Sequence, residues 1–201
     1  MPRPATNNRE KLVETALDLI WRSSYGSVSV DDICKASEVK KGSFYHYFKS
    51  KSELAIAAMD KYWEDKQGDL NHIFSPSKPA LNRFKDFSDF IIQMTKEKAE
   101  TYGHVVGCPF SSLGLEVAGN EETIRARCDK ISNEHKTFML SSIRDAEAEG
   151  AINNDEDADL KAERLLSFIT GLITTSRLKN STKELERDLE DGIMKILNLK
   201  L

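Results

Sequence analysis

Apolar residues recur three and four positions apart along most of this chain, the spacing that places side chains on one face of a helix. Only five prolines and ten glycines interrupt its 201 residues, and alanine, leucine, glutamate and lysine are frequent. Because these residues favour helix, the pattern predicts an all-α fold of about nine helices. The expected helices cover residues 9–24, 30–36, 41–48, 51–72, 80–102, 110–117, 121–149, 160–178 and 183–199.

Residues 29–51 predict two short helices around a tight turn at residues 37–39. Ser29 is a good N-cap for the first of them, and two aspartates follow in its first turn. The second helix carries basic, polar and aromatic side chains and has the size that fits the major groove of DNA. Together with the helix at residues 9–24, these two helices make three short packed helices, of which the third exposes polar residues, and this arrangement is a helix-turn-helix. We therefore expect a DNA-binding head in residues 1–50 and a larger helical body in residues 51–201.

The distribution of charge agrees with this division. The whole chain has a net charge of −4, which is unusual for a protein that approaches phosphate. Residues 1–51, however, hold nine basic and six acidic residues, a net of +3, and the remainder carries −7. A basic head on an acidic body is expected if only the head meets DNA.

The run KGSFYHYFKSKSEL at residues 41–54, preceded by SVDDIC at residues 29–34, closely resembles the head of the tetracycline-repressor (TetR) family of transcriptional regulators. The resemblance is strong over about residues 9–60, and beyond them it lies in the number and length of the helices. Two positions depart from the family pattern: Glu38 stands where the family usually has glycine in the turn, and Cys34 where it usually has alanine. Glutamate is strained at position 38 if its backbone is left-handed.

Individual roles in DNA recognition are expected from the position of each residue in or around the helix-turn-helix. Phe44 and Phe48, four positions apart, are expected to face the core, and Arg3 and Arg9 to reach flanking phosphate or the minor groove. For each polar residue the alternative is a solvated surface side chain. The predicted contacts to base edges are Lys41, Gly42, Ser43 and Tyr45, and the predicted contacts to phosphate are Ser29, Lys40, His46, Tyr47 and Lys51.

One head of this size buries too little surface for tight specific binding, so a dimer on a palindromic operator is expected. The resemblance implies that the last two helices form a four-helix interface with a second copy. Their apolar stripes suit that role, although such stripes also fill a protomer core. The predicted interface residues are Leu165, Ile169, Leu172, Ile173, Leu185, Leu189 and Ile193.

The resemblance also implies that the body binds a small inducer that lowers the affinity for the operator. The middle helices are rich in phenylalanine, methionine and isoleucine, as apolar ligand pockets are, and the alternative for each residue is ordinary core packing. Cys108 precedes Pro109 at a predicted helix start, where a thiol is nucleophilic. We expect Cys108 to sense electrophiles or oxidants, and the alternative is that it only packs the start of the helix. The candidate ligand-binding residues are Tyr62, Trp63, Phe87, Phe90, Ile91, Met94, Cys108, Phe110, Leu113, Phe138 and Phe168.

Other classes of protein find little support in the sequence. No phosphate loop, nucleophile triad or paired-cysteine motif is present, and the four histidines are scattered, so neither an enzyme nor a metal or other cofactor is expected. No apolar run of the roughly 18 residues that span a bilayer occurs, and the first residues lack a signal sequence, which favours the cytoplasm. The leading hypothesis is a ligand-responsive repressor. The alternative is a DNA-architectural or cell-division factor of the same fold without a small ligand.

Overall fold

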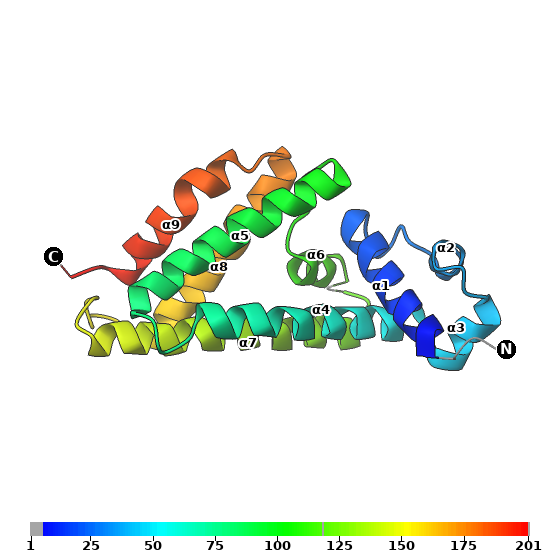
Figure 1. Ribbon diagram of the computed structural model, residues 1–201, viewed down its shortest axis with the longest axis horizontal. Coiled ribbons are helices and arrows are strands. Elements are labelled where there is room, and N and C mark those ends of the chain that lie inside the picture. Colours follow the sequence, from blue (N-terminus) through cyan, green and yellow to red (C-terminus); the bar gives the residue numbers. More distant parts are fainter. Residues whose placement is uncertain (1–5, 118, 201) are drawn as a thin grey trace. The chain divides into compact units, whose positions relative to one another are not determined.

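The computed structural model describes residues 6–117 and 119–200, and within these ranges the chain is all-α, as predicted. The expected helices are all present, and their ends differ from the predicted ones by at most three residues (Figure 1). The helices of the described residues are α1 Thr6–Arg22, α2 Val30–Ala36, α3 Lys41–Tyr47, α4 Lys51–Ile73, α5 Ala80–Tyr102, α6 Pro109–Glu116, α7 Glu122–Ala148, α8 Ala158–Lys179 and α9 Lys183–Leu197.

The chain forms two compact units. The first comprises the residues up to Lys66 together with Pro109–Lys130, and the second comprises Gln67–Cys108 together with the residues from Ile131 onward. α6 therefore belongs to the same unit as α1, α2 and α3, whereas the sequence assigned it to the body. The helices α4 and α7 each contribute residues to both units.

The core of the first unit is built where α1, α2 and α3 meet the start of α4. Leu12, Ile33, Phe44 and Leu54 are each fully buried in it. Apolar spacing accounts for these positions, and the beginning of α2 is set by a capping box between Ser29 and the third residue of the helix. These short helices therefore depend on one shared core, since isolated helices of this length are unstable in water.

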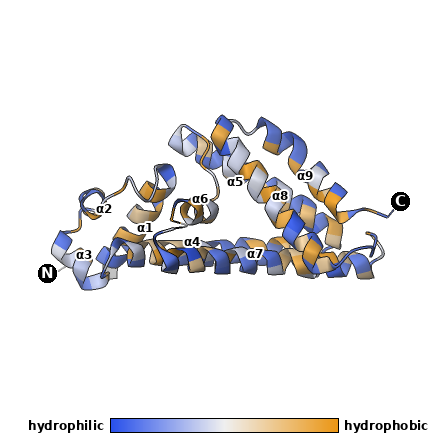
Figure 2. Ribbon diagram, turned by 180° about the vertical axis from the view of Figure 1, so that it is seen from behind, coloured by the Kyte–Doolittle hydropathy of each residue, from blue (hydrophilic) through white to orange (hydrophobic). Residues whose placement is uncertain are grey.

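The core of the second unit lies between α5, α7, α8 and α9. In the last helix, Leu185, Leu189 and Ile193 are fully buried, and α9 lies beside α8 and α5 (Figure 1). Figure 2 shows the polar residues of α9 on its outer side and its apolar residues toward α8. The four-residue spacing that predicts the helix is therefore also the spacing that buries one of its faces.

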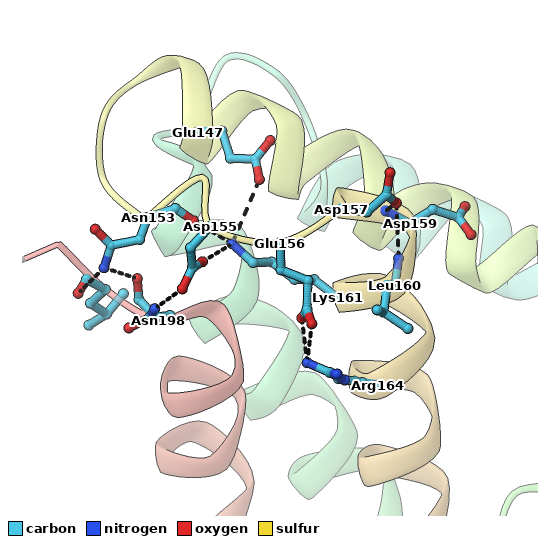
Figure 3. A network of polar contacts seen from close by, with 11 residues as sticks. Glu147, Asn153, Asp155, Glu156, Asp157, Asp159, Leu160, Lys161, Arg164 and Asn198 are labelled. Atoms are coloured by element: carbon cyan, nitrogen blue, oxygen red, sulfur yellow. Dashed lines mark hydrogen bonds and ion pairs between the residues drawn. The ribbon is translucent and has the colours of Figure 1, made fainter.

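A buried lysine organises one end of the second unit (Figure 3). The side chain of Lys161 in α8 is 1% exposed, and its Nζ lies 3.3 Å from Oδ1 of Asp155 and 3.7 Å from Oε1 of Glu147. Nζ also donates to the carbonyl of Asn153, and Asn198, just after α9, donates to Asp155 at 2.7 Å. The lysine thus joins α7, α8, their connection and the end of α9, as a buried charge requires partners.

None of the helices in residues 6–117 and 119–200 is both long enough and apolar enough to cross a membrane.

Candidate nucleic-acid interface

α2, the turn after it and α3 form the predicted helix-turn-helix. The hydroxyl of Ser37 donates to the carbonyl of Ile33 at 2.7 Å, and the amide of Val39 donates to the carbonyl of Cys34 at 3.0 Å. Between them, Glu38 has a φ of 56°, so the glutamate occupies the left-handed position that the sequence comparison with the family suggested. The turn is therefore formed in spite of the missing glycine.

The recognition helix α3 is held by its apolar side. Phe44 and Phe48 are buried, as predicted, and their ring centroids are 6.1 Å apart. Tyr45 is 54% exposed, and its ring meets that of Phe44 edge-on at 5.0 Å. The predicted DNA-contacting residues of this region all retain accessible surface: Lys40, Lys41, Gly42, Tyr45 and His46 are exposed, and Ser43 and Tyr47 are half-buried.

Lys41 and Ser29, both predicted to contact DNA, have hydrogen-bond partners within the head. Nζ of Lys41 lies 2.8 Å from Oδ1 of Asp31, and this hydrogen bond raises the pKa of Lys41. To contact a base, the ammonium of Lys41 must therefore leave Asp31. Breaking this ion pair costs little free energy because both groups are exposed. The amide and the hydroxyl of Ser29 both donate to Oδ2 of Asp32, which lowers the pKa of that carboxyl group.

Lys51 has a role within the fold that the sequence did not reveal. Its ammonium donates to the carbonyls of Tyr25 at 2.9 Å and Val28 at 3.1 Å, and it lies 4.0 Å above the ring of Tyr25. These partners are 26 and 23 positions away, in the loop between α1 and α2. The predicted phosphate contact of Lys51 stays a prediction, and the structure adds that this lysine fixes the loop.

The arginines of the N-terminal region were expected to reach flanking DNA. Arg9 is exposed, and its guanidinium lies 5.4 Å from the ring centroid of Phe48. Arg3 lies outside the described residues.

The candidate ligand-binding residues of the first unit gather around Phe110 at the start of α6. The ring of Phe110 is 5.5 Å from that of Tyr62 and 6.3 Å from that of Trp63, and Leu113 is buried one turn later. Tyr62 also meets the ring of Trp21 in α1 at 5.0 Å, a contact that the sequence did not suggest.

In the second unit, the aromatic residue Phe74 joins the candidate ligand-binding residues, although the sequence did not indicate it. Its ring lies 4.9 Å from that of Phe87 and 5.7 Å from that of Phe138, both of them candidates. Three more candidates lie on α5, the helix of Phe87: Ile91 is buried, and Phe90 and Met94 are half-buried. Phe168 instead lies against Gly192 of α9.

Cys108 directly precedes α6, at the helix start that the sequence predicted. All three cysteines are free thiols; Cys108 is half-buried, whereas Cys34 and Cys128 are buried. A reagent in solution is therefore expected to reach Cys108 first.

The predicted dimer residues divide into two sets. Leu165, Ile169, Leu185, Leu189 and Ile193 are buried within the protomer, so their side chains fill its core and are not available to a partner. The reason is that the apolar stripes of α8 and α9 face each other and α5. Leu172 and Ile173 remain half-buried, and Leu178 is 84% exposed at the end of α8.

Comparison with known proteins agrees with this architecture. Residues 12–58 match the family described as "Bacterial regulatory proteins, tetR family", and residues 80–190 match "Tetracyclin repressor-like, C-terminal domain". The transcriptional regulator AcuR of Cereibacter sphaeroides is 29% identical over 171 residues, 85% of this chain and 76% of AcuR. The crystal structure of regulatory protein TetR from Rhodobacter sphaeroides superposes with a TM-score of 0.81 at 26% identity, covering 93% of this chain and 97% of that chain.

The transcriptional repressor NemR of Escherichia coli is 22% identical over 183 residues, 91% of this chain and 90% of NemR. The crystal structure of its reduced form superposes with a TM-score of 0.80 at 20% identity, covering 96% of this chain and 98% of that chain.

Fold and exposed recognition helix together define a helix-turn-helix transcriptional regulator. The two matched regions extend over more than half of the chain, and the chain belongs to the TetR family. Members of this family are DNA-binding transcription factors and not enzymes.

Proposed function

We propose that this TetR-family regulator is a repressor that binds a palindromic operator as a homodimer and is released by a small inducer. The observation that carries the proposal is α3, which keeps its polar, basic and aromatic side exposed while Phe44 and Phe48 hold it to the core. A helix presented in this way can enter the major groove and read base edges. The repressor assignment follows relatives such as NemR, which is named a repressor.

The dimer is proposed to form on the outer side of α8 and α9, in the second unit. Leu178 and the half-buried Leu172 and Ile173 leave apolar surface there, and an exposed apolar patch on a soluble protein commonly marks an interface. A symmetric pair of heads then predicts two half-sites in a palindrome. We propose that the protein acts in the cytoplasm, as a DNA-binding regulator of this family.

The operator can be tested by selecting duplexes from a random pool with the wild-type protein. A palindrome is the expected result, and a selection without sequence preference contradicts the proposal. Tyr45→Ala should change the preferred bases within a half-site, since it removes a base contact. Lys40→Ala should instead weaken binding to all sequences and lower the salt slope by about one. Lys61→Ala, whose ammonium pairs with Asp65 on the exposed side of α4, is the control that should change neither.

The inducer is proposed to be apolar and aromatic, or electrophilic. The aromatic groups around Phe110 and Phe74 support the first class, and Cys108, the half-buried thiol at the start of α6, supports the second. A quinone should label Cys108 before the other cysteines and release the operator. If Cys108→Ser is released equally well, the electrophile class is wrong.

The same experiment separates the repressor from an architectural factor of this fold. An architectural factor would bind DNA with an affinity that neither apolar aromatic compounds nor electrophiles change. The aromatic residues around Phe110 and Phe74 would then serve only as core.

A further inference from the structure

Tyr25, in the loop between α1 and α2, is held from several sides by groups far away in the sequence. Its amide donates to Oε2 of Glu116 at 2.8 Å, and its carbonyl accepts from Lys51 at 2.9 Å. Its hydroxyl donates to Glu121 at 3.3 Å, and burial and Glu121 raise the pKa of Tyr25 to about 12, so the hydroxyl keeps its proton at neutral pH. The loop is thereby held between a carboxylate and an ammonium.

The next residue, Gly26, allows Glu116 to approach this closely. Its amide donates to Oε1 of Glu116 at 2.5 Å, so one carboxylate accepts from two consecutive amides. A β-carbon at position 26 would lie 2.8 Å from that oxygen. The backbone of Gly26 is not left-handed, so the nearby carboxylate is the feature that opposes a larger residue there. Hydrogen bonds of amides to an ionised carboxylate are about twice as strong as neutral ones.

The other end of α6 is linked to α1 through a residue of α4. Phe110, in the first turn of α6, meets Tyr62 of α4 at 5.5 Å, and Tyr62 meets Trp21 of α1 at 5.0 Å. Glu116, the last residue of α6, reaches the loop after α1 directly. Both ends of this eight-residue helix are therefore connected to the DNA-binding head within the first unit.

The loop held by Glu116 leads into the helix-turn-helix. Val28 is buried in the core that α1, α2 and α3 share, and Ser29 caps α2. Because packed helices move as bodies and not by continuous deformation, a shift of this loop changes the position of α2 and α3.

We propose that Glu116 is a positioning residue for DNA binding: its carboxylate holds the loop between α1 and α2, and with it the recognition helix, to the end of α6. The inference rests on the proposed function and adds a contact between α6 and the head on which operator affinity depends. Glu116 acts without touching DNA, and its loss removes no group that is predicted to contact phosphate.

The test compares four proteins on a fluorescent operator duplex that the wild type has selected: wild type, Glu116→Ala, Gly26→Ala and the double variant. Each single variant should weaken operator binding by about tenfold, the scale of one or two charge-assisted hydrogen bonds. In the double variant the added methyl group no longer meets a carboxylate, so it should bind no more weakly than Glu116→Ala alone. The slope of affinity against salt should stay that of the wild type. Glu122→Ala, which removes an exposed carboxylate paired with Arg125, is the matched control and should bind as the wild type does.

Three results would overturn the proposal. They are additive losses in the double variant, a salt slope lowered by about one in Glu116→Ala, and wild-type operator affinity in Glu116→Ala. The third counts even if the variant unfolds at a lower temperature, because Glu116 would then only stabilise the fold.

The contact can also be followed without DNA, which separates its failure from that of the proposed function. Amide hydrogen exchange at Tyr25 and Gly26 should accelerate in Glu116→Ala and remain unchanged in Glu122→Ala. The chain has two tryptophans. Trp63 contacts the ring of Phe110, and Trp21 contacts Tyr62, which contacts Phe110, so their emission should shift as well. Unchanged exchange and emission would overturn the positioning role. Failure of the wild type to select a DNA sequence would overturn the proposed function.

Discussion

The ring of Phe168 in α8 lies directly on the backbone of Gly192 in α9. A β-carbon at position 192 would be 2.1 Å from Cζ of Phe168, so the two helices approach at a place where only glycine fits. We expect Gly192→Ala to destabilise the protein by about 1–3 kcal/mol, because the ring must leave its place. Urea unfolding measures the change. In a Phe168→Ala background the same substitution should be neutral or stabilising, and an equal loss there would show that the ring is not the obstacle.

Removing the charge of Lys161 from its ion cluster should cause a large loss of stability. Lys161→Met should lower the free energy of unfolding by about 3 kcal/mol, since it leaves Glu147 in a poorly solvated place without its cation. The double variant Lys161→Met, Glu147→Leu should recover much of this loss. Lys61→Met removes an exposed ion pair with Asp65 and should change stability by less than about 0.5 kcal/mol in the same denaturation experiment.

The left-handed backbone at Glu38 predicts a stabilising substitution. Glu38→Gly should raise the stability by about 1 kcal/mol, because glycine has no β-carbon to strain at a φ of 56°. Glu38→Ala keeps the β-carbon and should give no such gain. Thermal unfolding of the two variants compares them directly, and an equal effect of both would assign the gain to the loss of the carboxylate.

His135 in α7 predicts a pH dependence of stability. Burial lowers the pKa of His135 to about 4, below the ordinary value of about 6.5, and its Nδ1 lies 3.1 Å from the carbonyl of Ile131. The unfolded chain therefore binds a proton that the folded chain does not, and stability is lost as the pH falls from about 6.5 to about 4. The loss should reach up to about 3 kcal/mol. His135→Phe should flatten this part of the curve of unfolding free energy against pH, whereas the exposed His72→Gln should not.

Lys51 offers a test between two roles. Because its ammonium holds the carbonyls of Tyr25 and Val28, Lys51→Met should destabilise the protein by about 1–3 kcal/mol and weaken operator binding, and the slope of affinity against salt shows whether Lys51 also contacts phosphate. The comparison is Lys40→Ala, for which we expect a slope lower by about one. An equally lower slope for Lys51→Met would establish the phosphate contact that the sequence predicts.

Local features of the chain were sufficient to determine the helices and the DNA-binding motif. The apolar spacing placed Phe44 and Phe48 in the core, and the cap at Ser29 set the start of α2, because both depend on residues within one or two turns. What the apolar side of each long helix packs against depends instead on residues far away in the sequence. Leu185 and Leu189 have the spacing of an interface and of a core alike, and only the packing of α8, α9 and α5 shows that they are core.

The contacts that position the head were decided by tertiary structure alone. Tyr25 and Glu116 are 91 positions apart, and Lys51 finds carbonyls 23 and 26 positions away. A hydrogen bond between a side chain and a distant backbone group leaves no periodicity or motif in the sequence, since every residue except proline offers the same amide and carbonyl. The sequence by itself therefore determined which helices form and which of them can read DNA, and the tertiary structure decided what holds the recognition helix in place.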